Sequence, residues 1–215
     1  MSRQPENVRV RRTRKLLREA LVDLIEEKGF DKVTVGEIAE RALVSRAAFY
    51  RNYRDKYDLV EQIYDEAMSA LLGTVDDDTP PPDRWAAFLD HIDTYHRFYA
   101  ALLGRKGSPW FADRMRATLS AMVTEHLPSP AGDPAAPLIP TVLGAMFTQS
   151  ITWWLENDRP IPAREIAATS ARLAGAVIRE ANATTDSSSA VNVGGGLRSA
   201  GPAAGTHSAT RVAPG

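Results

Sequence analysis

The chain has 215 residues, of which 44% are hydrophobic and 25% charged, and its formal net charge at pH 7 is −1. It contains no cysteine, which excludes disulfides, thiolate metal sites and thiol nucleophiles. No apolar run approaches the roughly 18 residues of a membrane span, and no continuous apolar core follows the Arg-rich start as in a signal peptide. We therefore expect a cytoplasmic protein with no membrane contact.

The near-neutral total combines a basic N-terminal part with an acidic remainder. Residues 1–18 carry seven Lys or Arg residues against one acidic residue, whereas residues 61–215 carry 12 basic and 17 acidic residues. A basic arm over residues 1–12 that leads into a helix is typical of proteins that contact DNA phosphates. A solvated N-terminus without a partner fits the outermost arginines equally well.

The first predicted element is an amphipathic helix from about residue 8 or 11 to Lys28. Leu17, Leu21 and Ile25 recur on one face at helical spacing. Gly29 follows directly, and glycine suits the left-handed position that closes a helix.

Residues 34–53 predict two short helices joined by a tight turn. Thr34 and Glu37 match a capping box, and Ser45 can cap a second helix that runs to about Tyr53. Asp55 can then cap a long fourth helix, from Lys56 to about residue 72. This spacing is that of a helix-turn-helix, whose second helix enters a DNA major groove. Two packed helices with a turn also occur in other all-helical proteins, so the geometry alone does not establish DNA binding.

The remainder predicts a second, larger helical region and a tail. An acidic, Pro-rich run over residues 76–82 indicates a linker, and helices are expected at about 83–103, 109–127, 135–156 and 162–183. Residues 184–215 are rich in Ser, Gly and Ala, offer little to bury, and predict a disordered tail. The fold class is therefore all-α.

Residues 12–66 resemble the DNA-binding domain of the TetR family of bacterial transcriptional regulators. The matching residues are Gly29-Phe30, Thr34-Val35-x-x-Ile38-Ala39-x-x-Ala42 and Val44-Ser45-x-x-x-Phe49-Tyr50-x-x-Tyr53-x-x-Lys56-x-x-Leu59. The resemblance implies an N-terminal three-helix helix-turn-helix DNA-binding domain over 1–56. A larger C-terminal helical domain over 57–183 would bind an effector and dimerise. Leu43 departs from the family, which usually has Gly there, and a positive φ would cost a leucine about 1 kcal/mol or more.

The resemblance and the side-chain chemistry together predict the DNA contacts. Arg46 can donate two hydrogen bonds to the edge of a guanine, and the family usually has a phosphate-binding lysine at the position of Lys56. Tyr53 also fits the small core, because it lies four residues after Phe49. The predicted set is Thr34, Ser45, Arg46, Ala47, Ala48, Tyr50, Arg51, Asn52, Tyr53 and Lys56.

Aromatic and Met side chains are dense between residues 85 and 154. They fit either ordinary core packing or an apolar pocket, and regulators of this family mostly hold an effector in this domain. Polar contacts to the effector are expected from His91, Tyr95 and His96. The predicted pocket residues are His91, Tyr95, His96, Tyr99, Trp110, Phe111, Met115, Met122 and Phe147.

The last two helices are expected to form a homodimer interface. In the TetR family these helices pair with their symmetry mates, and a dimer reads both halves of a palindromic operator. The alternative for each residue is the core of its own chain. The predicted interface residues are Gly144, Phe147, Ile151, Leu173, Ala174 and Val177.

These features predict a dimeric, sequence-specific DNA-binding transcriptional regulator, expected to be a repressor, whose operator affinity responds to an apolar or aromatic small molecule. The alternative is a helical small-molecule-binding or interaction module without specific DNA binding. Catalysis, cofactors and metals are not expected. His91 and His96 miss the i, i+4 spacing of a zinc pair, and no phosphate loop or nucleophile elbow is present.

Overall fold

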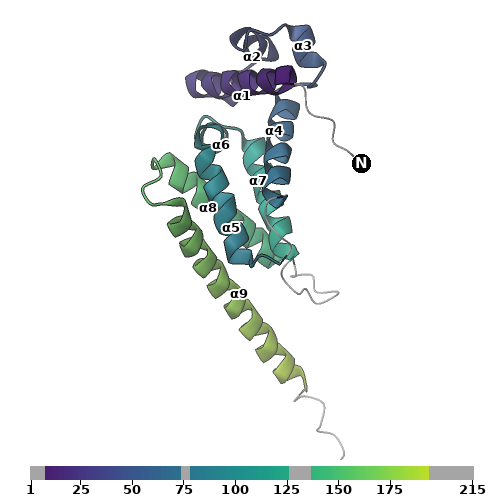
Figure 1. Ribbon diagram of the computed structural model, residues 1–215. Helices are drawn as coiled ribbons and strands as arrows, with labels where there is room; N and C mark the ends of the chain where they lie inside the picture. Colours follow the sequence, from purple (N-terminus) through teal and green to yellow (C-terminus); the bar gives the residue numbers. More distant parts are fainter. Residues whose placement is uncertain (1–7, 74–77, 126–136, 194–215) are drawn as a thin grey trace, which may run out of the picture. The chain divides into compact units, whose positions relative to one another are not determined.

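The computed structural model describes residues 8–73, 78–125 and 137–193, and every regular element in these ranges is a helix (Figure 1). The chain divides into two units, Met1–Val177 and Ile178–Gly215. The predicted all-α class is confirmed. In chain order the elements are α1 (Val8–Lys28), the 3-10 turn η1 (Phe30–Lys32), α2 (Val35–Arg41), α3 (Arg46–Tyr50), α4 (Lys56–Leu72), α5 (Pro81–Thr94), α6 (His96–Leu103), α7 (Pro109–Thr124), α8 (Leu138–Glu156) and α9 (Ala163–Val193).

The first helices form the predicted three-helix unit. Leu17, Leu21 and Ile25 of α1 are fully buried, and α1 packs against α2, which packs against α3. Gly29 ends α1 with φ 86°, and its N–H donates to the Ile25 carbonyl at 2.8 Å. The amphipathic pattern therefore predicted both the buried face of α1 and the residue at which it ends.

Both caps of the helix-turn-helix are present as predicted. Thr34 and Glu37 form a complete capping box at the start of α2, and the Ser45 hydroxyl accepts from the Ala48 N–H at 3.1 Å at the start of α3. The Lys28 ammonium pairs with the Glu37 carboxylate and lowers its pKa to about 2, with a further contribution from the Thr34 hydroxyl. Glu37 therefore stays ionised at physiological pH, which keeps the capping box in place.

Leu43 lies in the turn between α2 and α3 with φ 56° and a side chain that is 93% exposed. The turn thus keeps the left-handed conformation that favours glycine, although a leucine occupies it. The conformation costs a residue with a Cβ roughly 1–2 kcal/mol. The leucine side chain recovers none of this cost through packing, because it is almost fully exposed.

Leu43→Gly is expected to raise the free energy of unfolding by roughly 0.5–1 kcal/mol in urea denaturation. Relief of the backbone strain exceeds the added freedom of glycine in the unfolded chain, which is about 0.4–1 kcal/mol. Leu43→Ala is the control, since it removes the same side chain and keeps the strain. A Leu43→Gly variant no more stable than Leu43→Ala would show that the turn is unstrained.

Residues 83–103 were predicted as one helix, and this prediction is wrong. The helix breaks at Tyr95, with φ −111° and ψ 28°, into α5 and α6. The two segments meet different neighbours, because α5 packs on α4 whereas α6 packs on α1, α7 and α8. No Gly or Pro marks the break, so the sequence pattern gave no sign of it.

Polar contacts join α6 and the loop after it to the C-terminal end of α1. The Arg97 guanidinium donates to Asp23 at 2.9 Å and to Glu26 at 2.8 Å. The Lys106 ammonium donates to the Glu26 carbonyl at 2.8 Å, and the Phe30 N–H donates to the Lys106 carbonyl at 2.9 Å. The end of α1 that leads into the helix-turn-helix is therefore bonded to the larger domain.

Helix α9 continues to Val193, ten residues beyond its predicted end at about residue 183. The first strong helix breaker after Ala163 is Gly175, which the helix tolerates, and the next is Gly194. Residues 184–193, which were predicted to belong to a disordered tail, are therefore helical. Residues 194–215 of that tail, and the predicted linker at 76–77, lie outside the described residues.

Candidate functional site

Helix α3 presents most of its predicted DNA-contacting residues to solvent. Phe49 is fully buried and anchors the helix, while Arg46, Ala47 and Arg51 are exposed and the Tyr50 side chain is 58% exposed. Ser45 is also exposed, and Ala48 is half-buried. The sequence therefore places one residue of α3 in the core and leaves the opposite face open.

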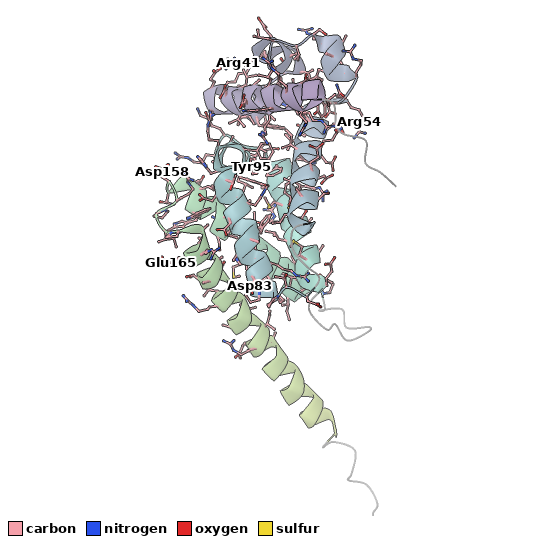
Figure 2. The ribbon with its side chains drawn as sticks, viewed as in Figure 1. Arg41, Arg54, Asp83, Tyr95, Asp158 and Glu165 are labelled. Carbon is pink, nitrogen blue, oxygen red and sulfur yellow. The ribbon has the colours of Figure 1, made fainter. Side chains whose placement is uncertain are left out.

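Two of the predicted polar contacts already have partners within the chain. The Thr34 hydroxyl donates to Glu37 at 2.7 Å, and the Asn52 side-chain amide donates to the Ala48 carbonyl at 2.9 Å. Nearby, Arg54 pairs with Asp58 at 3.1 Å, and Arg41 pairs with Glu27 at 2.8 Å. Figure 2 labels Arg41 and Arg54. These arginines therefore contribute less free charge than their number suggests.

Lys56, predicted to bind a phosphate, is bonded to backbone carbonyls of the chain itself. Its ammonium donates to Phe30 at 2.7 Å, to Asp31 at 3.1 Å and to Val33 at 3.0 Å. An ammonium has three N–H donors, so these three carbonyls account for all of them. Partial burial lowers the Lys56 pKa, against the opposing effect of Asp31. In this conformation Lys56 connects the start of α4 to η1, and its phosphate contact stays a prediction.

Lys56→Met is expected to lower the free energy of unfolding by about 1–2 kcal/mol, measured in urea, because three carbonyls lose a charged donor. Lys32→Met is the matched control, since Lys32 is an exposed lysine of η1 and its replacement should change stability little. Unchanged stability together with weaker DNA binding would instead favour the phosphate contact.

Tyr53 differs from its predicted place in the DNA interface. Only 3% of it is exposed, and its ring packs on Phe49 with the centroids 5.4 Å apart. The i, i+4 spacing puts both rings on the inner face of this segment, which is the core position that the sequence also allowed.

Gly36 is a residue of the candidate interface that sequence reasoning missed. A Cβ at this position would overlap the guanidinium of Arg46, which rests against the first turn of α2. The absence of a side chain at Gly36 thus lets Arg46, the main candidate for base recognition, lie beside α2. The contact is between two helices, and no pattern along the sequence reports it.

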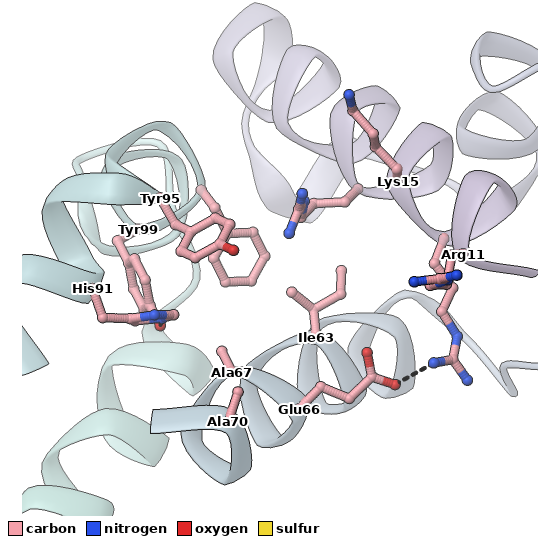
Figure 3. Close-up of a pocket in the computed structure, with 12 residues that line it drawn as sticks. Arg11, Lys15, Ile63, Glu66, Ala67, Ala70, His91, Tyr95 and Tyr99 are labelled. Carbon is pink, nitrogen blue, oxygen red and sulfur yellow. Dashed lines mark hydrogen bonds and ion pairs between the residues drawn. The ribbon is translucent and has the colours of Figure 1, made fainter. Parts of the chain in front are cut away.

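Only three of the nine predicted pocket residues line a cavity. His91, Tyr95 and Tyr99 line an open cavity of about 320 Å³ (Figure 3). Phe111, Met115 and Phe147 are buried in the packed core instead. Of the others, Met122 is half-buried, the Trp110 ring packs edge-on against Tyr57 at 5.3 Å, and His96 Nδ1 bonds to the Asp93 carbonyl at 3.0 Å.

Apart from Phe98 of α6, the rest of the cavity lining comes from α1 and α4, which sequence reasoning did not include. The α1 residues are Arg11, Arg14, Lys15 and Arg18, and the α4 residues include Ile63, Glu66, Ala67 and Ala70. At the inner end, His91 Nε2 and the Tyr99 hydroxyl lie 3.0 Å apart. Burial lowers the pKa of His91 and raises that of Tyr99, so both groups are neutral at physiological pH.

Four of the six predicted dimer-interface residues lie inside the chain's own core. Gly144, Phe147, Ile151 and Ala174 are buried, and a Cβ on Gly144 would come within 2.8 Å of the Arg116 carbonyl oxygen of α7. Phe147 packs on Trp85, with ring centroids 4.4 Å apart. Small and apolar residues thus serve the packing of α8 against its own domain.

Leu173 and Val177 are exposed, as an interface requires, at 53% and 36%. Further exposed apolar side chains lie on α8, where Leu138, Val142 and Trp153 recur near helical spacing. Leu138, Val142 and Trp153 of α8 and Leu173 and Val177 of α9 are therefore exposed large apolar residues of these helices.

Within the described ranges, no group of His, Cys, Asp or Glu side chains could hold a metal ion. A search of the same residues finds no helix long and apolar enough to span a bilayer.

A short exposed helix, capped by Ser45 and anchored by Phe49 on two further helices, defines the chain as a helix-turn-helix protein of the DNA-binding type. Residues 17–63 match the family model described as bacterial regulatory proteins, tetR family. Residues 17–63 are therefore a DNA-binding region of the TetR type.

Curated relatives match less than half of the chain. YdeS of Bacillus subtilis, an uncharacterized HTH-type transcriptional regulator, is 35% identical over 96 residues, which are 45% of this chain and 45% of YdeS. YvkB of the same organism, also an uncharacterized HTH-type regulator, is 38% identical over 60 residues, 28% of this chain and 32% of YvkB. The matches therefore span less than half of these relatives.

Solved structures share the fold over most of the chain. A TetR transcriptional regulator from Streptococcus agalactiae aligns with a TM-score of 0.58 and 20% identity, covering 77% of this chain and 95% of that one. FadR of Bacillus subtilis, solved in complex with stearoyl-CoA, aligns with a TM-score of 0.51 and 14% identity, covering 74% and 96%. At these identities the likeness concerns the fold.

Proposed function

We propose that the protein is a homodimeric transcriptional regulator that binds a palindromic operator in the cytoplasm and represses transcription until an effector lowers its DNA affinity. Residues 1–56 would bind DNA, and residues 57–183 would bind the effector and dimerise. No catalytic step is part of this function.

The observation that carries the proposal is the geometry of α3. Its N-terminus is capped, Phe49 fixes it from below, and Arg46, Ala47, Tyr50 and Arg51 remain exposed on the side away from the core. N-terminal residues of a recognition helix contact base edges, and flanking cations contact phosphates. The match of residues 17–63 to the tetR family model supports the same role for α3.

Dimerisation is supported by the exposed apolar side chains of α8 and α9. Leu138, Val142, Trp153 and Leu173 are between 47% and 61% exposed. Large exposed apolar side chains on two helices are a feature that interfaces between proteins cover. A two-fold dimer would also place two recognition helices about one DNA turn, roughly 10 base pairs, apart.

The test is selection of bound sequences from a random duplex library, followed by fluorescence anisotropy and analytical ultracentrifugation. We expect an enriched palindrome, two chains per site, and affinity that falls steeply with salt as counterions are released. Binding without sequence preference, or no binding, would favour the alternative of a helical binding module that does not read DNA.

A further inference from the structure

The cavity between α1, α4, α5 and α6 has an apolar side formed largely by α4 (Figure 3). Ile63, Ala67 and Ala70 project from α4 toward Tyr95 and Tyr99. The two alanines leave the space unfilled, because a larger side chain at either position would occupy it. A volume of about 320 Å³ has room for about ten groups the size of a water molecule or a methylene.

The opposite side of the cavity is cationic. Arg11, Arg14, Lys15 and Arg18 all line it from α1, and Glu66 is the one acidic residue in the lining. Glu66 pairs with Arg14 at 2.6 Å, so its charge is already balanced. Outside the lining, Glu19 lies 3.8 Å from the Lys15 ammonium. With Glu19 and Glu66 both counted, the four cations exceed the acidic residues by two beside an apolar wall.

Tyr95 brings the two sides together. The Arg18 guanidinium lies over its ring, 5.2 Å from the centroid, and the centroids of the His91 and Tyr95 rings are 4.8 Å apart. Tyr95 occupies the break between α5 and α6, which turns its ring toward α1. The break thus places an aromatic side chain at the junction of cationic and apolar surfaces.

We propose that this cavity binds a small amphipathic anion, with an apolar chain or ring against α4 and its acidic group against the α1 cations. A neutral apolar ligand would bury part of the cationic wall without a partner, which is costly. A small inorganic anion would leave the apolar wall in water. An amphipathic anion satisfies both surfaces.

The proposal rests on the proposed function in one respect, which is the consequence for DNA. The α1 cations that line the cavity belong to the basic stretch that would contact DNA phosphates. An anion bound to Lys15 and Arg18 would lower the positive potential of this stretch and hold α1 against α4 and α6. The ligand therefore binds the DNA-free state better and weakens operator binding, and DNA weakens ligand binding by the same factor.

Binding is tested on the full chain by isothermal titration calorimetry with two anions and their neutral counterparts: decanoate against decanol, and 2-naphthoate against 2-naphthalenemethanol. We expect at least one anion to bind one site per chain, about tenfold or more tighter than its alcohol, because charge-assisted contacts to Lys15 or Arg18 exist only for the anion. If neither anion binds better than its alcohol, the proposal is overturned.

Variants locate the site. Lys15→Gln and Arg18→Gln should each weaken anion binding about tenfold, and Ala67→Phe should abolish it by filling the cavity. Arg12→Gln is the matched control, since it removes an exposed cation of α1 that does not line the cavity. Equal binding by Arg18→Gln, Ala67→Phe and Arg12→Gln, with thermal melts showing all three folded, would overturn the proposal.

The calorimetric result does not depend on DNA, so the two proposals fail separately. Anion binding without any sequence-specific DNA binding would contradict the proposed function alone. DNA binding without anion binding would contradict the cavity alone. Where both occur, the anion should weaken operator binding, and Ala67→Phe should remove that effect.

Discussion

Arg46→Ala is expected to lower affinity for the selected operator about 10- to 100-fold and to leave affinity for random DNA nearly unchanged. A bidentate arginine–guanine contact is worth roughly 1–3 kcal/mol of discrimination between bases, whereas non-specific binding comes from phosphate contacts. Arg46 is exposed at the first position of α3, where its guanidinium can leave the first turn of α2 and reach a base edge. Fluorescence anisotropy with the two duplexes measures both affinities.

Arg172→Ala is the control for this prediction, because Arg172 is an exposed arginine of α9, far along the chain from α3. It should leave both affinities unchanged. If Arg46→Ala lowers the affinity for operator and for random DNA equally, Arg46 contacts a phosphate. If it lowers neither affinity, Arg46 is not part of the DNA interface.

Gly144→Val is expected to lower the free energy of unfolding by about 3 kcal/mol. A Cβ at Gly144 would lie 2.8 Å from the Arg116 carbonyl oxygen and 2.9 Å from the Ser120 backbone nitrogen, and backbone atoms cannot move aside as a flexible side chain can. Over-packing of this kind costs roughly 1–3 kcal/mol and sometimes more. Thermal and urea denaturation of the purified variant measure the loss.

The neighbouring substitution Ala145→Val provides the control, since Ala145 is exposed on the same helix and has room for a larger side chain. This experiment also decides between the two roles considered for Gly144. If Gly144→Val keeps its stability but becomes monomeric in ultracentrifugation, Gly144 belongs to a dimer interface and the packing on α7 is not what requires a glycine.

Local signals predicted much of the N-terminal domain. The capping box at Thr34, the cap at Ser45 and the closing Gly29 act within four residues of themselves, so the sequence contains all of their partners. The same holds for Asp55, which caps α4 by accepting from the Asp58 N–H at 2.8 Å. Interactions of this range can be predicted from the sequence before the fold is known.

Interactions between segments that are distant in the sequence could not be predicted. Lys56 was assigned to DNA by resemblance, yet its donors reach carbonyls 23 to 26 residues earlier in the chain. Gly144 suited any close helix contact, and only the packing of α8 on α7 shows which one requires it. The cavity was predicted from aromatic residues of one domain, whereas its cationic side comes from α1.

The ion pairs of Arg97 with Asp23 and Glu26 have a consequence for measurements of how DNA affinity depends on ionic strength. All three side chains are substantially exposed, at 55%, 41% and 47%, so each pair is weak and is screened as electrolyte is added. Added electrolyte therefore loosens the attachment of α1 to α6 at the same time as it weakens contacts to a duplex. The slope of the logarithm of DNA affinity against the logarithm of salt concentration would then report both counterions released from DNA and ions taken up by the protein. Measuring this slope for Arg97→Ala and for the unaltered chain would separate the two contributions.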